Sequence, residues 1–393
     1  MFPFGRKALP HWPLDPDVVY LNHGTVGVTP VRVLEAERAI RDEIEWRPAQ
    51  FLLRELSAVA VGLPRAKPPR MRAAAARVAA FLGAREPDLV FVENATTGVN
   101  AVLRSIDFRP GDEIVVTDLA YGAIAMGAAH AASRAGASVR TVETPPADRG
   151  AGAIADAIVA AVGPRTRLAI VDHVTSESAL VLPLQEIAAR VRAKGALVLA
   201  DGAHALGMLP LQIESLGVDW YTGNLHKWAW SPRSAAILWA APEHHAGLHP
   251  TVISWGLGDG IAAEFDWVGT RNPAAYLAAP VGIELMEEWG TDAVRAHNHA
   301  LAWEAAVTLP RRWGTETPMD ESMVGSMTTV PLPASFGSTG EDAARLRDAL
   351  LFEDRIEVQI HAWRERLWTR VSTQVYNDAS DLERLGAAVS ARA

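Results

Sequence analysis

Short hydrophobic runs alternate with longer alanine-rich segments along the first two thirds of the chain. The short runs favour β-strands, and several are apolar throughout, which is typical of strands covered on both faces of a parallel sheet. The alanine-rich segments favour helices. Strands are predicted at 89–92, 113–117, 138–142, 168–172, 197–201, 220–221 and 236–238. Helices are predicted at 70–81, 95–105, 123–134, 152–161 and 184–193.

Strands and helices that alternate at this interval predict βαβ units, and hence an α/β fold with a mainly parallel central sheet and helices on both faces. Ligands of such sheets bind beyond the carboxyl ends of the strands, where several polar residues of this chain lie. After about residue 275 the pattern changes and favours a smaller C-terminal α+β domain. This part is predicted to contain helices at 274–289 and 293–309 and strands at 326–332, 356–361 and 367–374.

The length of 393 residues is too great for one small core and suits two linked domains. We expect an N-terminal arm over residues 1–20, a large domain over 21–275 and a small C-terminal domain over 276–393. The proline-containing segment 46–70 is either an ordered surface excursion or a flexible connection, and its sequence favours neither.

Composition excludes several classes of function. Hydrophobic residues make up 49% and charged residues 21%, as in an ordinary globular enzyme, and the net charge of −9 argues against nucleic acid as a partner. The chain has no cysteine, which excludes disulfides, thiolate metal sites and thiol nucleophiles. It has neither an apolar run near the roughly 20 residues of a membrane helix nor a secretory signal, so we expect a cytoplasmic protein without a membrane partner. No acidic or thiol ligand is patterned with His244, His245 and His249, so no metal site is expected.

An acid at a strand end and a lysine further along predict the central chemistry. Asp201 ends the strand 197–201, and Lys227 follows Tyr221 in an aromatic stretch. Pyridoxal phosphate (PLP) needs such a pair, because a lysine forms a Schiff base with the cofactor aldehyde and an acid keeps the pyridine nitrogen protonated. The alternatives are that Asp201 caps a helix and that Lys227 is a surface lysine.

Three further segments could complete a PLP site. Asn94 precedes a predicted helix, whose first N–H groups, on Ala95 and Thr96, form an anion site with the Thr96 hydroxyl; an ordinary helix cap is equally consistent. Tyr121 lies just beyond a strand, where its ring could cover the pyridine or could be a half-buried loop residue. Arg370 lies in an apolar strand and suits a substrate carboxylate, although a structural acid could pair with it instead.

Taken together, these segments resemble the class V aminotransferase family of fold-type I PLP-dependent enzymes. Within that family the chain is most similar to the isopenicillin N epimerase-like branch, which includes amino-acid C–S lyases. The likeness extends from about residue 21 to residue 377. The motifs that carry it lie, in order, at 21–27, 94–98, 201–207, 223–228, 267–271, 370–372 and 375–377.

The resemblance implies a role for each of these positions. Lys227 is then the Schiff-base lysine, Asp201 the partner of the pyridine nitrogen, and His204 a contact of the ring hydroxyl or of the Schiff base region. Arg370 is implied to bind the substrate carboxylate. The remaining implied cofactor contacts are Asn94, Ala95, Thr96, Asn224 and His226 at the phosphate, and Thr175 and Ser176 near the ring hydroxyl.

The resemblance also implies a homodimer with shared active sites, because Thr270 matches a residue that reaches the phosphate of the neighbouring subunit. Three departures from the family pattern stand out. Asn272 replaces an aspartate, and residues 231–234 replace a glycine-rich stretch after the lysine. The absence of cysteine rules out persulfide transfer to a loop thiol, although a lyase that releases sulfur directly remains open.

The sequence thus predicts an enzyme that acts on an amino acid, with Lys227 as general base at the α-carbon. An epimerase is expected first, with a C–S lyase and an aminotransferase as alternatives, since all three reactions share these residues. Epimerisation needs an acid on the face opposite Lys227, for which Tyr121 and His23, near the substrate, are the candidates. A PLP-binding regulator is the alternative of a different class; such proteins carry a DNA-binding domain, for which the sequence before residue 21 leaves no room.

Overall fold

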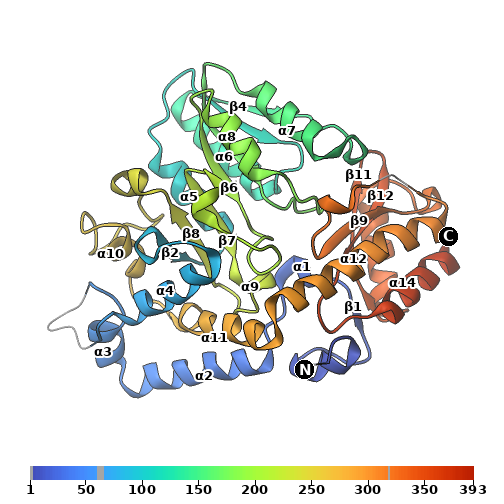
Figure 1. The fold of residues 1–393 in the computed structure, drawn as a ribbon, viewed down its shortest axis with the longest axis horizontal. Helices are drawn as coiled ribbons and strands as arrows, with labels where there is room; N and C mark the ends of the chain where they lie inside the picture. The colour runs from blue at the N-terminus through green and yellow to red at the C-terminus, as the bar shows by residue number, and fades with distance from the viewer. Residues whose placement is uncertain (1–2, 60–65, 317–318) are drawn as a thin grey trace.

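A seven-stranded sheet forms the centre of the molecule (Figure 1). The computed structural model describes residues 3–59, 66–316 and 319–393. The strand order is β2-β8-β7-β6-β5-β3-β4, and β8 alone runs antiparallel to its neighbours in this sheet. The strands are β2 (Leu89–Val92), β3 (Glu113–Thr117), β4 (Ser138–Val142), β5 (Thr166–Asp172), β6 (Leu197–Asp201), β7 (Trp220–Asn224) and β8 (Ala236–Ala240).

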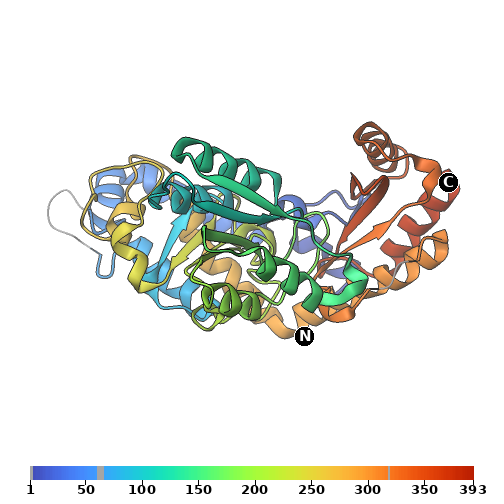
Figure 2. The ribbon, with the colours of Figure 1, turned by 90° about the horizontal axis from the view of Figure 1, so that it is seen from above.

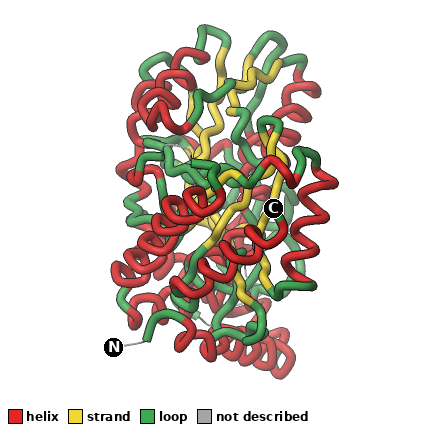
Figure 3. Tube along the Cα trace, turned by 90° about the vertical axis from the view of Figure 1, so that its right-hand side faces the viewer, coloured by secondary structure: helices red, strands yellow, loops and turns green. Residues whose placement is uncertain are grey.

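Both faces of this sheet are covered by helices, as Figure 3 shows from the side. Side chains alternate between the faces along each strand: Leu89 and Phe91 of β2 join one core, and Val90 and Val92 join the other. The first core is closed by α4 (Arg70–Leu82), α7 (Gly150–Ala161), α8 (Leu184–Arg192) and α11 (Ala274–Trp289). The second is closed by α5 (Ala95–Ser105), α6 (Gly122–Ala135) and α10 (Ile261–Asp266). The predicted mainly parallel sheet between two helical layers is therefore confirmed.

One strand of this sheet is longer than its sequence predicts. β7 continues past 220–221 to Asn224, because Gly223 and Asn224 pair with β8. A Cβ on Gly223 would lie 2.7 Å from the carbonyl oxygen of Gly202, so the strand passes too close to its neighbour for any side chain at this position. The helix that holds Lys227 begins directly after Asn224, so Lys227 lies just beyond the end of the sheet.

The C-terminal part forms a second layer, seen apart from the large sheet in Figure 2. Its antiparallel sheet has the order β11-β12-β9, and the predicted strand 356–361 splits at the buried Val358 into two strands of different sheets. The strands are β9 (Met327–Pro331), β10 (Ile356–Glu357), β11 (Gln359–Trp363) and β12 (Arg366–Ser372). The helices that pack on them are α12 (Thr291–Trp313), α13 (Gly340–Phe352) and α14 (Ala379–Arg392).

The N-terminal residues lie against this second layer (Figure 1). β1 (Val19–Tyr20) pairs in parallel with β10, and Val19 and Leu21 belong to the same core as the C-terminal helices. The chain then enters α1 (His23–Val26), which contacts α9 (Leu225–Trp228) beside the large sheet. Gly27, with φ of 69°, leaves no space for a Cβ against the carbonyl oxygen of His226. The domain division at residues 20 and 275 stays a prediction.

Part of the segment 46–70 is described. After α2 (Val31–Trp46) it forms α3 (Pro48–Gln50) and a π-helical turn (Phe51–Glu55), and its residues 60–65 lie outside the described part. Within the described ranges, no helix is both long and apolar enough to cross a membrane. A location in the cytoplasm stays a prediction.

Candidate active site

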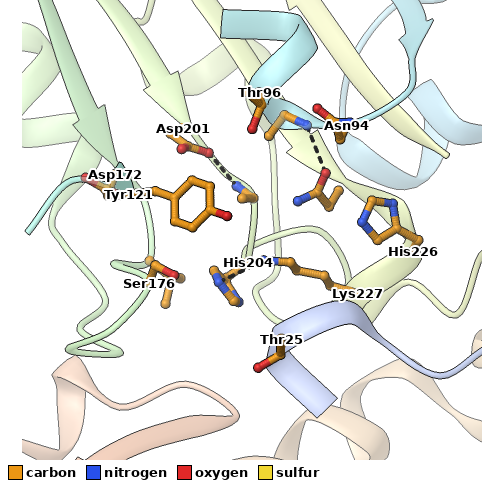
Figure 4. A pocket seen from close by; sticks show the side chains of 14 residues that line it. Thr25, Asn94, Thr96, Tyr121, Asp172, Ser176, Asp201, His204, His226 and Lys227 are labelled. Atoms are coloured by element: carbon orange, nitrogen blue, oxygen red, sulfur yellow. Dashed lines mark hydrogen bonds between the residues drawn. The ribbon is translucent and has the colours of Figure 1, made fainter. Parts of the chain in front are cut away.

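A pocket of about 240 Å³ lies at the carboxyl ends of the parallel strands (Figure 4). Asp172 ends β5, Asp201 ends β6 and Asn224 ends β7, so the sheet itself brings these three side chains to one edge. The first residues of α5 and α9 and one residue of α1 complete the wall. The lining residues are Thr25, Asn94, Ala95, Thr96, Tyr121, Asp172, Val174, Ser176, Asp201, Ala203, His204, Asn224, His226 and Lys227.

Lys227 presents its amine inside this pocket, with Nζ 3.1 Å from Nε2 of His204. Burial and, to a smaller extent, the positive charge of Arg370 lower the pKa of Lys227 to about 7, with Asp201 opposing the shift. A neutral, nucleophilic amine is therefore accessible at neutral pH. The alternative of an exposed surface lysine does not describe this position.

His204 is held in one tautomer by a residue next to the lysine. The indole Nε1 of Trp228 lies 3.4 Å from Nδ1 of His204 and can only donate a hydrogen bond. Burial, and next the charge of Lys227, hold the pKa of His204 well below its usual range, so the ring is neutral. A neutral ring that accepts at Nδ1 carries its proton on Nε2, which faces the amine of Lys227. Sequence reasoning did not assign this role to Trp228.

Asp201 lies beside a second buried carboxyl, Asp172, which sequence reasoning missed. The register of β5 and β6 pairs the two residues directly. Burial raises the pKa of both; the charge of Asp201 raises that of Asp172 further, whereas the N–H of Ala203, 3.0 Å from Oδ1, lowers that of Asp201. The shared proton therefore belongs on Asp172, and Asp201 remains the anion. A turn follows Asp201, so Asp201 caps no helix.

The N-terminus of α5 points its positive end into the pocket. Asn94 is the cap of this helix, since Oδ1 accepts a hydrogen bond of 2.8 Å from the N–H of Thr97. The N–H of Ala95 donates to Oδ1 of Asn224 at 2.9 Å. Both asparagines thus organise the helix start, and the cap alternative holds for Asn94.

His226 and Tyr121 also line the pocket. His226 donates from Nδ1 to the carbonyl oxygen of Ala235 at 3.0 Å, and burial lowers its pKa to about 4, so Nε2 is the nitrogen left for a ligand. A phosphate beside Nε2 would favour a proton there. Tyr121 precedes α6 and is 50% exposed, and Figure 4 shows its ring facing the pocket.

Arg370 reaches the pocket through two of its wall residues. Its Nη1 donates to the carbonyl oxygen of Ser176 at 2.7 Å, and its Nη2 donates to the hydroxyl of Thr25 at 2.8 Å. Its Nε is buried without a partner, and among the described residues no carboxylate forms an ion pair with it. Burial lowers the pKa of Arg370 to about 10. Glu177 acts on Arg370 through its charge, but among the described residues no structural acid bonds to it directly.

Besides Arg370, which contacts the pocket only through its wall residues, three predicted residues do not line the pocket. His23 is buried with Nδ1 2.8 Å from the hydroxyl of Tyr376 and Nε2 2.6 Å from the carbonyl oxygen of Lys227, so it supports the lysine from behind. Thr175 is buried in a turn, where its hydroxyl accepts from the N–H of Leu180 at 2.8 Å. Thr270 is exposed on the surface.

The histidines set aside as metal ligands do have acidic neighbours that are distant in sequence. Nε2 of His244 lies 2.8 Å from Asp219, and Nδ1 of His249 lies 2.7 Å from Glu264. Only the fold brings these acids close, which is why no pattern in the sequence indicated them. His244 thus contacts the loop before β7 and His249 contacts α10, both outside the pocket.

The donor set of the pocket fits PLP. The positive helix end suits a phosphate, the neutral amine of Lys227 suits an aldehyde, the anion of Asp201 suits a protonated ring nitrogen, and the ring of Tyr121 suits an aromatic face. No other pocket in the described residues combines these groups.

Comparisons with known proteins agree with this chemistry. The family model described as aminotransferase class-V matches residues 68–385. A probable chloroplastic L-cysteine desulfhydrase of Arabidopsis thaliana is 31% identical, over 96% of this chain and 83% of that protein. An isopenicillin N epimerase of Streptomyces clavuligerus is 32% identical, over 96% of each chain. The solved structure of a cysteine desulfurase from Thermococcus onnurineus NA1 has a TM-score of 0.80 and 19% identity, covers 100% of this chain and 98% of that chain, and shows the same fold.

Proposed function

Because the chain belongs to the class V aminotransferase family, we propose that it epimerises the α-carbon of an amino acid. PLP is its cofactor, and the chain is an enzyme rather than the non-catalytic regulator that its sequence also allowed. Lys227 carries the proposal, because a pocket amine with a pKa of about 7 is suited to remove a proton at neutral pH.

Each part of the pocket would hold one part of the cofactor. Thr96, His226 and the start of α5 would bind the phosphate, Asp201 would pair with the ring nitrogen, and Tyr121 would cover the ring. When bound, PLP withdraws electrons from the bonds of the substrate α-carbon. The proton on Asp172 helps here, because it leaves the negative charge of the pair on Asp201.

The substrate would be held between Arg370 and Lys227. A carboxylate would neutralise the buried charge of Arg370, which has only neutral partners and a free Nε. The neutral amine of Lys227 would turn its lone pair from Nε2–H of His204 to the substrate and accept the α-proton. Carboxylate binding and proton removal thus use only residues that line the pocket or contact its lining residues.

Epimerisation also needs a proton donor on the opposite face. Tyr121 is the better of the two candidates, because its hydroxyl points into the pocket, whereas both ring nitrogens of His23 are engaged elsewhere (Figure 4). The 32% identity to isopenicillin N epimerase over nearly the full length supports the same reaction class.

Elimination at a C–S bond is the second candidate function. Lys227 has a pKa of about 7, whereas burial lowers the pKa of His226 to about 4 and that of His204 well below its usual range, and elimination can proceed with a single base. The relative named as a probable L-cysteine desulfhydrase supports it. Without cysteine in the chain, such a lyase would release sulfur directly.

One assay separates these reactions. PLP-loaded protein is incubated in deuterated water with a panel of L-amino acids, and α-deuterium, chirality, keto acid, sulfide and ammonia are followed together. Deuterium with inversion is expected; keto acid without free ammonia would instead indicate transamination, and sulfide with ammonia and keto acid would indicate a lyase. Lys227→Ala should lose the visible absorbance of the lysine-bound cofactor, whereas Lys7→Ala, at an exposed lysine, should retain it. Retained absorbance in Lys227→Ala would contradict the central assignment.

We also propose a homodimer in which Thr270 contributes to the partner's site. Thr270 is exposed and outside its own pocket, and the nearby loop exposes Val252, Ile253, Trp255 and Leu257, an apolar surface of the kind that interfaces cover. Light scattering should give twice the mass of the chain at micromolar concentration. A monomer with full cofactor occupancy would contradict shared sites.

A further inference from the structure

A groove leads away from the pocket that contains Lys227. A cavity of about 390 Å³ shares Tyr121 and Ser176 with that pocket. A third cavity, of about 140 Å³, shares Ser178 and Trp363 with the second. The shared lining residues place the three cavities next to one another in a row, from the lysine past Tyr121 to Trp363.

The walls of this groove come from both layers of the molecule. The strands β11 and β12 are joined by a two-residue turn in which Arg364 and Glu365 have positive φ, as a tight hairpin requires. Nη2 of Arg364 donates to the carbonyl oxygen of Thr144 at 2.9 Å, which anchors the hairpin to the large-sheet layer. The hydroxyl of Thr329 on β9 donates to the carbonyl oxygen of Glu177 at 2.6 Å. The groove is therefore a preformed feature of the fold.

The far end of the groove is mostly apolar, although Asp148, Arg364, Ser178 and Thr329 also line it. Leu180, Met319, Trp363 and Trp368 line it, and the indole N–H of Trp368 is satisfied by the carbonyl oxygen of Trp363 at 2.9 Å. The guanidinium of Arg364 covers one face of Trp363, 4.3 Å from the ring centroid. The volume of about 140 Å³ is close to the roughly 150 Å³ of an apolar cavity that binds one benzene molecule. This end fits one uncharged, ring-sized group.

We propose that the substrate is an α-amino acid whose side chain carries an apolar, ring-sized group along this groove to Trp363. The proposal rests on the proposed function, since Lys227 and Arg370 must hold the amino-acid end. Tyr121 and Ser176 mark where the side chain leaves the first cavity. A side chain as small as that of cysteine fills only the first cavity and gains nothing from the aromatic end.

A series of S-substituted L-cysteines tests this substrate class. The sulfur carries a methyl, benzyl, 2-phenylethyl or 3-phenylpropyl group, and kcat/KM for α-proton exchange with deuterated water is measured by NMR. The best phenyl derivative should exceed S-methyl-L-cysteine by about 10-fold or more, as one apolar group in a fitted pocket commonly does. A phenyl series no better than the methyl compound would overturn the proposal.

Variants at the far end locate the effect. Trp363→Ala should lower kcat/KM for the best phenyl derivative about 10-fold or more and leave the methyl compound within about twofold. The control is Trp46→Ala, because Trp46 is 75% exposed on α2 and lies outside every cavity of the groove; both substrates should be unaffected. Equal losses for both substrates in Trp363→Ala would overturn the proposal. Trp363→Leu, which keeps an apolar side chain in the hairpin, serves if the alanine variant does not fold.

A binding measurement separates this proposal from the proposed function. If no derivative exchanges its α-proton, the proposed function fails, and calorimetry with the PLP-loaded protein still tests the groove. A Kd at least about 10-fold lower for the best phenyl derivative than for the methyl compound supports it. Equal Kd values overturn it.

Discussion

Two buried arginines of this chain differ in their hydrogen-bond partners: one has carboxylates and the other has only neutral groups. Arg72 of α4 is 8% exposed and donates to both oxygens of Asp266, at 2.8 and 2.6 Å, to Glu86 at 3.0 Å and to the carbonyl oxygen of Leu89 at 2.9 Å. Arg370 of β12 is 4% exposed and has only neutral partners, with its Nε unsatisfied among the described residues. The charge of Arg72 is therefore neutralised by bonded carboxylates, whereas Arg370 has no bonded carboxylate among the described residues.

The difference separates a structural site from a binding site. Burial lowers the pKa of Arg72, but the carboxylates of Asp266 and Glu86 together outweigh it and the net shift is upward. For Arg370 burial is the larger cause, Glu177 opposes it only in part and without an ion pair, and the pKa falls to about 10. An uncompensated buried charge opposes folding, so its presence beside a pocket indicates an anion that arrives from outside. The carboxylate of an amino-acid substrate is such an anion.

The largest expected effect is on stability, at the compensated site. Arg72→Met should lower the free energy of unfolding by about 3–5 kcal/mol, because it leaves the buried Asp266 without its partner. Urea denaturation measures this loss. Arg345→Met, at a side chain 70% exposed, is the control and should change stability by less than about 0.5 kcal/mol. A loss below about 1 kcal/mol in Arg72→Met would remove the contrast between the two arginines.

The next largest effect is on substrate affinity, at the uncompensated site. Arg370→Gln should weaken binding of α-amino acids by about 1.5–3 kcal/mol, the contribution of hydrogen bonds to a charged group. Its loss of stability should be smaller than that of Arg72→Met, because no carboxylate is left unpaired. KM or calorimetric Kd, with urea denaturation alongside, measures both quantities. Unchanged affinity with PLP still bound would exclude Arg370 as the carboxylate site.

The smallest effect is a shift in pH dependence. Capture of PLP needs the neutral amine of Lys227, so its rate in the cofactor-free protein should rise with pH around a midpoint of about 7 rather than near the ordinary lysine value of 10.5. Arg370→Gln should move the midpoint upward, since a positive charge that lowers the pKa is gone. The shift should be partial, because burial is the larger cause and remains. Stopped-flow absorbance from pH 6 to 9 measures it (a range of about three units around the midpoint), and Arg345→Met should leave the midpoint unchanged.

The sequence predicted the central residues of the pocket because their chemistry shows locally. Asp201 and Lys227 each follow a strand, and the α/β pattern places strand ends at one edge of a sheet. Asp172 was missed although it also ends a strand, because a single acid at a strand end has no signal of its own until the register of β5 and β6 pairs it with Asp201. Trp228 was missed because its indole was regarded only as part of an apolar neighbourhood.

For the fold outside the pocket, the sequence predicted which strands exist but not every strand boundary. Continuous apolar runs indicated the strands of the large sheet, whereas the end of β7 contains Gly223 and Asn224, which are unfavourable in strands and are retained by pairing with β8. The split at Val358 was not predictable from pattern alone, since its two halves pair with partners as distant as β1 and β12.

Sequence by itself determined the cofactor chemistry and the layered α/β fold, because both depend on residue type and local periodicity. Only the tertiary structure decided which buried charged side chains have a bonded group of opposite charge. Arg72 and Arg370 each contact a partner 194 positions away, yet Asp266 is an anion and the oxygen of Ser176 is a neutral carbonyl. The tautomer of His204 and the proton on Asp172 depend likewise on contacts between separate elements. Desolvation and hydrogen bonding act over a few ångströms in space, and only folding establishes which charges come that close.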